Sequence, residues 1–90
     1  MRVILHAPTA DALQRARSNA RNLRLRQPDA EIVIVVNAGG VPAALEIREP
    51  ETDDLLRVCA NTLSAQKLSA PRDINVVPAA VETIAQLQIE

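Results

Sequence analysis

Residues 31–36, Glu-Ile-Val-Ile-Val-Val (EIVIVV), decide the fold class of this chain. The run of β-branched residues predicts a short strand, and its lack of polar alternation indicates that both faces of the strand are covered. Such strands are typical of parallel sheets that carry helices on their faces. The next residues, Asn37 to Gly40 (NAGG), predict a sharp turn because Gly39 and Gly40 have permissive backbones.

The segments before this strand predict one more strand and a long helix. Residues 3–7 form a short apolar run that ends before Pro8, because proline disfavours helix at the residue preceding it. Thr9 is typical of a helix N-cap and Asp11 adds a negative charge to the first turn, so we expect a helix over residues 10–26. Its apolar side carries Leu13, Ala16, Ala20 and Leu23. Its other side, which we expect to be solvated, carries Arg15, Arg17, Arg21 and Arg24.

The segments after the turn repeat the alternation of helix and strand. The expected helices are residues 41–47, 62–67 and 79–89, and the expected strands are residues 55–59 and 74–77, with a charged loop over residues 48–54. The second of these helices is capped by Asn61 or Thr62. The last has an apolar stripe of Ala80, Val81, Ile84, Ala85 and Leu87. The order predicts an α/β fold of three layers, α/β/α, with a mainly parallel sheet of about four strands in a single domain over residues 1–90.

Composition limits the classes of partner and compartment. The 90 residues carry 10 basic and 11 acidic side chains, so overall charge points to neither nucleic acid nor an anionic membrane. No segment approaches the ~18 continuous apolar residues of a membrane span. The single cysteine cannot form an internal disulfide, which fits a reducing cytoplasm. Because Phe, Tyr and Trp are absent, we expect contacts between subunits to supply part of the missing burial.

Polar residues follow the expected strands, whose carboxyl ends meet at one edge of a parallel sheet, where ligands bind in such folds. Cys59 ends a strand just before a helix, and the free amides and dipole of that helix would stabilise a thiolate. The same position also suits a buried cysteine that acts as a small hydrophobic residue. The candidate site residues at this edge are Cys59, Asn61, Thr62, His6, Asn37, Gly39 and Gly40.

Other chemistries have weaker support. His6 could accept a proton from Cys59, or it could be bonded to a neighbouring carbonyl. Both options stay open because the sequence does not show whether the first strand lies beside the third. The turn at Gly39 and Gly40 lacks the glycine spacing of a dinucleotide loop and the lysine of a P-loop. One cysteine and one histidine cannot build a four-ligand site within a subunit, so no metal is expected.

Four segments taken in order resemble the DsrE/DsrF-like family of intracellular sulfur-oxidation and sulfur-relay proteins. They are VILHAPT with DALQRARSNARNL, PDAEIVIVVNAGGV, LLRVCANTLSAQKL and INVVPAAVETIAQLQ. The resemblance implies a three-layer α/β/α fold and homo-oligomers, often trimers or hexamers. It also implies that Cys59, within VCANTL, matches the cysteine that carries sulfur as a persulfide in active members. The resemblance assigns no role to His6.

The leading functional hypothesis is therefore a sulfur carrier. The Cys59 thiolate would attack an incoming persulfide, hold the sulfur as Cys-S-SH and pass it to a partner thiol. Unidentified donor and acceptor proteins are required, and no metal or organic cofactor is expected. Two alternatives stay open. One is a non-catalytic oligomeric module that binds a small ligand or a protein segment, with Cys59 as packing. The other is a redox sensor in which Cys59 pairs between subunits.

Overall fold

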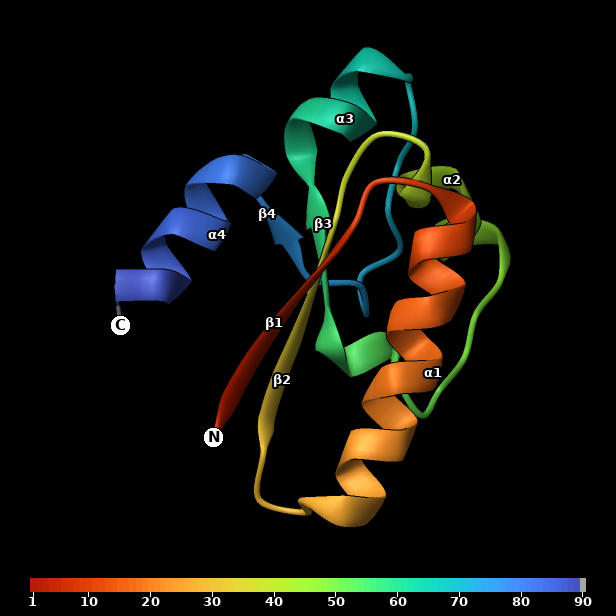
Figure 1. Ribbon diagram of the computed structural model, residues 1–90. Helices are drawn as coiled ribbons and strands as arrows, with labels where there is room; N and C mark the ends of the chain where they lie inside the picture. Colours follow the sequence, from red (N-terminus) through yellow and green to blue (C-terminus); the bar gives the residue numbers. More distant parts are fainter. Residues whose placement is uncertain (90) are drawn as a thin grey trace.

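Four parallel strands form the central layer of the computed structural model, which describes residues 1–89 (Figure 1). The strands are β1 (Arg2–Ala7), β2 (Glu31–Val36), β3 (Leu56–Cys59) and β4 (Val76–Val77). Their order in the sheet is β1-β2-β3-β4, so each strand lies beside its neighbour in the sequence, and every pairing is parallel. This confirms the predicted α/β fold with a sheet of four strands.

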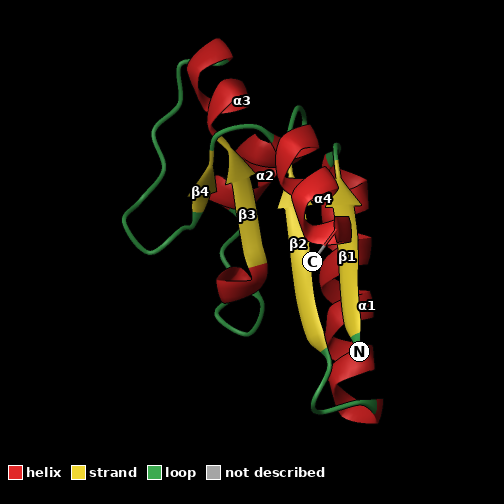
Figure 2. Cartoon of the chain, turned by 90° about the vertical axis from the view of Figure 1, so that its left-hand side faces the viewer, coloured by secondary structure: helices red, strands yellow, loops and turns green. Residues whose placement is uncertain are grey.

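Helices cover both faces of the sheet and complete the three layers (Figure 2). They are α1 (Ala10–Arg26), α2 (Gly40–Glu46), α3 (Ala60–Ala65) and α4 (Ala80–Ile89), with a short 3-10 helix, η1 (Asp53–Leu55). Parallel crossovers are right-handed, so three crossovers that all advance in one direction place their helices on the same face. The first two helices, α1 and α2, accordingly pack on one face, and α4, which follows the last strand, covers the other.

The main hydrophobic core lies between the sheet and the helices α1 and α2. It contains Ile32, Ile34 and Val36 of β2, Leu56 and Val58 of β3, Leu13, Ala16 and Ala20 of α1, and Val41 and Ala44 of α2. A smaller cluster on the opposite face contains Val33, Val35, Cys59 and Ala80, with Ile4, Ile84 and Leu87 packed against it. Because successive strand residues point to opposite faces, this division explains why β2 is apolar throughout.

Most element bounds follow the sequence-based expectations, and the differences have local causes. The α1 helix spans residues 10–26 as predicted, and the Thr9 hydroxyl accepts a hydrogen bond of 3.0 Å from the amide of Ala12. The last strand is shorter than expected and begins at Val76, although Ile74 is buried in the main core. The helix expected at 62–67 begins at Ala60, and its N-cap is Cys59 rather than Asn61 or Thr62.

The turn after β2 uses its glycines differently from the prediction. The residue with a left-handed backbone is Ala38, with φ of 46°, and both glycines have negative φ values. At Gly40 the requirement is space, since a Cβ there would lie 2.3 Å from the carbonyl oxygen of Ala7. A Cβ at Gly39 would lie 3.4 Å from its nearest neighbour, the carbonyl oxygen of Pro8, which is an ordinary contact distance.

The expectation of a fully solvated arginine face on α1 is wrong for Arg17, whose side chain is 1% exposed. Its guanidinium donates to the Thr52 hydroxyl at 2.6 Å, to the Asp53 carboxylate at 2.9 Å and to the carbonyl of Ile47 at 3.2 Å. The segment predicted as a charged loop therefore docks against α1. Burial raises the pKa of Asp53, but hydrogen bonds from Arg48, Arg17 and the Glu49 amide outweigh it, so this pKa is lowered.

The apolar stripe expected on α4 is divided between two sides of the helix. Ala80 is buried against the sheet, and Ile84 and Leu87 are partly buried beside it. Val81, however, is 78% exposed, and Ala85 is also exposed. The helix thus covers the sheet with one narrow side and presents apolar side chains to the solvent on another.

Candidate functional site

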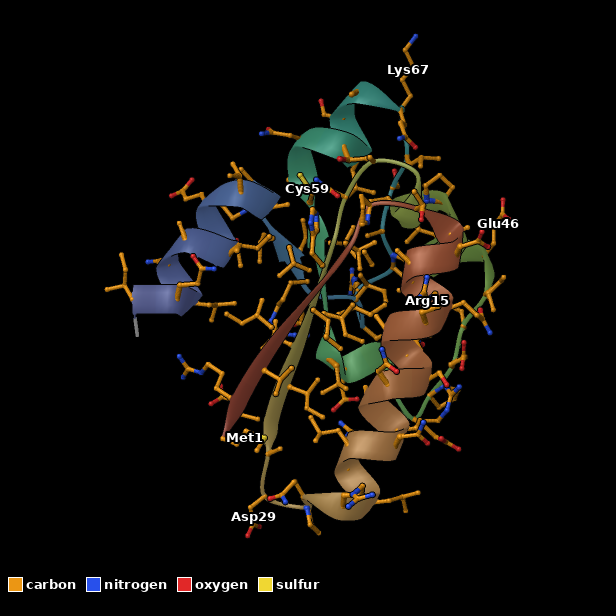
Figure 3. The ribbon with its side chains drawn as sticks, in the orientation of Figure 1. Met1, Arg15, Asp29, Glu46, Cys59 and Lys67 are labelled. Carbon is orange, nitrogen blue, oxygen red and sulfur yellow. The ribbon has the colours of Figure 1, made fainter. Side chains whose placement is uncertain are left out.

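The only cysteine of the chain lies where a strand passes directly into a helix. Cys59 is the last residue of β3 and the N-cap of α3, with an extended backbone at φ of −70° and ψ of 117°. Figure 3 shows it at this junction, where the first turn of α4 approaches from the other side. The position confirms the prediction of a thiol at a strand-to-helix transition on the carboxyl edge of the sheet.

The sulfur is covered rather than open. Cys59 is 5% exposed and belongs to the aliphatic cluster formed with Val33, Val35 and Ala80. The cover comes from α4, which the sequence alone could not place above Cys59. An open hollow of about 570 Å³ lies at the opposite end of the sheet, where its lining includes Met1 and Glu31.

Polar groups from two helices converge on the buried sulfur and lower its pKa. Burial alone raises the pKa of the Cys59 thiol, because a charged sulfur is disfavoured in an apolar environment. The amide and hydroxyl of Thr62, the amide of Ala80 and the amide of Asn61 together outweigh this effect. The Cys59 side chain makes no capping hydrogen bond to α3, and the amides and the Thr62 hydroxyl favour the charged form of the sulfur. The first turns of α3 and α4 therefore act on the same atom.

Thr62 connects this sulfur environment to the turn after β2. Its hydroxyl oxygen accepts a hydrogen bond of 3.1 Å from the amide of Ala38. The side-chain amide of Gln66 donates to the carbonyl of Ala38 at 3.2 Å, which fixes the same residue from a second side. These contacts hold a non-glycine residue in the left-handed region, where backbone strain must be offset by its surroundings.

His6 pairs with Asn37 and not with Cys59. The Nε2 atom of His6 lies 2.9 Å from the side-chain oxygen of Asn37, and because an amide oxygen only accepts, Nε2 carries the proton. Because β2 lies between β1 and β3, and Cys59 is two residues beyond the position level with His6, the backbones of His6 and Cys59 are more than about 10 Å apart. The possible Cys–His pair considered from the sequence is therefore not formed.

The structure brings together only part of the predicted site. Cys59, Asn61 and Thr62 are adjacent, whereas His6 and Asn37 pair with each other and not with the sulfur. Gly40 has a structural role against Ala7, and Gly39 is exposed. Sequence reasoning missed Ala80. The sequence indicates that a helix after a parallel strand begins at the edge where β3 ends, but not which face of the sheet that helix covers.

Neither a metal site nor a membrane-spanning helix is found within residues 1–89. No group of three or more His, Cys, Asp or Glu side chains within residues 1–89 is arranged to hold a metal ion. None of the helices in that range combines the length and the hydropathy that a membrane crossing requires.

Comparison of the whole chain with known protein families matches no family, and a search of curated proteins finds no significant match. The resemblance to the DsrE/DsrF-like family therefore stays a prediction from the sequence segments.

Proposed function

We propose that this protein is a cysteine-based sulfur carrier in which Cys59 holds sulfane sulfur as a persulfide. The observation that supports the proposal is the convergence of the Thr62, Ala80 and Asn61 amides on one sulfur atom, with a lowered thiol pKa as the result. A thiolate is the nucleophilic form of cysteine, and oriented amides stabilise an anion at a helix N-terminus.

The chemistry balances without a cofactor. The Cys59 thiolate attacks the terminal sulfur of a donor persulfide, so that a new sulfur–sulfur bond forms, the donor's sulfur–sulfur bond breaks and the donor leaves as a thiolate. An acceptor thiolate then attacks the terminal sulfur of Cys-S-SH and returns Cys59 to its thiolate form. Neither exchange changes the total number of electrons or needs an external oxidant.

Access to Cys59 requires a local displacement of α4. This helix contacts the sheet through Ala80, Ile84 and Leu87, while the larger core lies on the other face. Elements with few buried apolar contacts open at a lower free energy than the global unfolding of a domain. Opening of α4 would admit a donor and would also remove the Ala80 amide from the sulfur.

Mass spectrometry of the native protein after incubation with glutathione persulfide tests the proposal. We expect a mass increase of one sulfur atom on the peptide that contains Cys59, reversed by a reducing thiol and absent in Cys59→Ser. A small-molecule thiol in the same tube controls for the activity of the donor. An unmodified Cys59 beside a fully modified control thiol would refute the carrier function.

A second candidate function is a non-catalytic binding module in which Cys59 only packs. The observation that favours it is the 5% exposure of Cys59 among aliphatic neighbours. Under this hypothesis, Cys59→Ser leaves ligand binding and assembly intact, and a disulfide reagent reacts slowly with the native thiol at neutral pH. The same burial weakens the redox-sensor hypothesis, because a disulfide between subunits requires an accessible sulfur.

We also propose that the chain forms a homo-oligomer, a trimer or hexamer, in the cytoplasm. Support comes from the large apolar side chains that the single chain leaves exposed, among them Leu25, Val81 and Ile89. A free cysteine fits a reducing compartment. Sedimentation velocity would measure the mass of the assembly, and a monomer at all concentrations would contradict the oligomer.

A further inference from the structure

One edge of the sheet is formed by β1, which pairs with β2 alone within residues 1–89. The carbonyl of Met1 accepts from the Glu31 amide at 2.8 Å, and the carbonyl of Ala7 accepts from the Asn37 amide at 3.4 Å. In a parallel ladder, alternate residues direct their backbone groups to the same neighbour. The backbone N–H and C=O groups of Arg2, Ile4 and His6 therefore point away from β2, to the free edge.

The apolar side chains in the middle of this edge are only partly covered. Val3, Ile4 and Leu5 are half-buried, whereas the central residues of β2 are buried. A hollow of about 240 Å³ runs beside the edge, and it is lined by Leu5 and His6 of β1 and by Ala12, Arg15, Ala16 and Asn19 of α1. The edge thus offers unpaired backbone groups beside a hollow whose lining mixes polar and apolar side chains.

The one formally charged side chain in the lining of this hollow is Arg15, and no carboxylate from residues 1–89 belongs to that lining. Arg15, labelled on α1 in Figure 3, is exposed and makes no ion pair within residues 1–89. Arg2 lies farther along the edge and pairs with Glu31 at 3.2 Å. An acidic partner would complement Arg15 without displacing an existing ion pair.

We propose that the β1 edge, meaning the free side of residues 2–7 with the adjoining hollow, binds an extended acidic segment of a partner protein. The segment adds to the sheet as a further strand through the free backbone groups of Arg2, Ile4 and His6. Its side chains alternate, so that one row lies toward Leu5 and Arg15 and the other toward His6. This surface does not depend on the chemistry of Cys59.

The charge pattern argues against a second copy of this chain as the occupant. β1 (Arg2–Ala7) contains no Asp or Glu, so a second copy paired through the same strand would bring no carboxylate from that strand to Arg15. Arg2 of each copy is already paired with Glu31. An acidic segment supplies the missing counter-charge to Arg15.

Fluorescence anisotropy with a labelled peptide tests the proposal on the full chain. The probe is an acetylated, amidated peptide of alternating Glu and Val, about six residues long to match a strand. Two matched controls replace every Glu by Lys or methylate the alternate backbone nitrogens that would face β1. We expect binding of the acidic probe, and affinities for both controls that are lower by at least about tenfold.

Protein variants locate the binding at this edge. Arg15→Glu should weaken binding of the acidic probe by about tenfold, whereas Arg15→Lys retains most of it. Ile4→Pro removes an edge N–H that is not bonded to β2, a position at which proline is tolerated in a strand, and should also weaken binding. Circular dichroism monitors the fold, and if Ile4→Pro unfolds the protein, the Arg15 pair and the methylated peptide decide the question.

Any of four outcomes would overturn the proposal. They are no binding of the acidic probe at millimolar concentration, equal affinity for the lysine or methylated peptide, unchanged affinity in Arg15→Glu, and self-association of the chain that Ile4→Pro abolishes. The last outcome would assign the edge to a second copy.

Discussion

The amide of Ala38 donates a hydrogen bond of 3.1 Å to the hydroxyl oxygen of Thr62, joining the turn after β2 to the first turn of α3. A hydroxyl has one proton to donate, and with Ala38 occupying an oxygen lone pair, that proton remains available to the sulfur of Cys59. The turn and the thiol are thereby connected through one side chain.

Alkylation of Cys59 should show a pH midpoint below that of an ordinary thiol. The converging amides lower the pKa in the folded state, so the native thiolate persists to lower pH than the unfolded one. The Cys59 thiolate contributes fully to the free energy of unfolding above the pKa of the unfolded state. This contribution is lost as the pH falls through the pKa of the folded state.

The rate of reaction of Cys59 with iodoacetamide, measured against pH in native protein and in urea, tests this prediction. The midpoints are compared rather than the rates, because α4 slows access. A native midpoint equal to or above the denatured one would contradict the electrostatic assignment.

Removal of the Thr62 hydroxyl should raise the pKa of Cys59 and weaken the turn. Thr62→Val keeps the shape of the side chain but loses the bond from Ala38, at a cost of about 0.5–1.5 kcal/mol in the free energy of unfolding. Thr62→Ser keeps the hydroxyl and serves as the control. The alkylation midpoint and urea denaturation measure both effects. Identical midpoints in the valine and serine variants would show that the hydroxyl does not act on the sulfur.

Truncation of Arg17 should be strongly destabilising, unlike truncation of its neighbour on α1. Arg17→Met leaves the Thr52 hydroxyl and the Ile47 carbonyl without their donor, and the Asp53 carboxylate keeps only its hydrogen bonds from Arg48 and the Glu49 amide. We expect a loss of about 3 kcal/mol, the size seen when one partner of a buried ion pair is removed. The control is Arg15→Met, which changes an exposed arginine and should stay within about 0.5 kcal/mol of wild type. Urea denaturation measures the free energy of unfolding of both variants. Equal losses in the two would show that Arg17 contributes no more to stability than an exposed arginine does.

The two glycines after β2 should respond differently to alanine. In Gly40→Ala the new Cβ would lie 2.3 Å from the carbonyl oxygen of Ala7, a backbone atom that cannot move without shifting β1. We expect destabilisation of about 1–3 kcal/mol. In Gly39→Ala the nearest atom, the carbonyl oxygen of Pro8, is 3.4 Å away, so the change should be nearly neutral. Thermal unfolding of the pair is the measurement, and a tolerated Gly40→Ala would contradict the close approach of α2 to β1.

Local signals in the sequence were sufficient for the elements that carry the fold. The cap at Thr9 and the β-branched run before Asn37 predicted α1 and β2 with the bounds that the structure has. The position of Cys59 between a strand and a helix was predicted for the same reason. Each of these features depends on neighbours within a few residues.

Features that depend on distant segments were not predicted. The burial of Arg17 results from Thr52 and Asp53, which lie far along the chain, and helical periodicity alone cannot show that a later loop covers this side of α1. The strand order separates His6 from Cys59, and sequence does not specify that order. The cover over the thiol comes from α4, whose packing is likewise tertiary.

The sequential strand order, β1-β2-β3-β4, also has a consequence for biosynthesis. Each strand emerging from the ribosome can join the edge left by the one before it, so the sheet grows in the direction of translation. Helix α4 is the last of these elements to emerge, and until it docks, the Cys59 side of the nascent sheet stays uncovered. A sheet that forms in this order leaves the Cys59 thiol uncovered until α4 has docked.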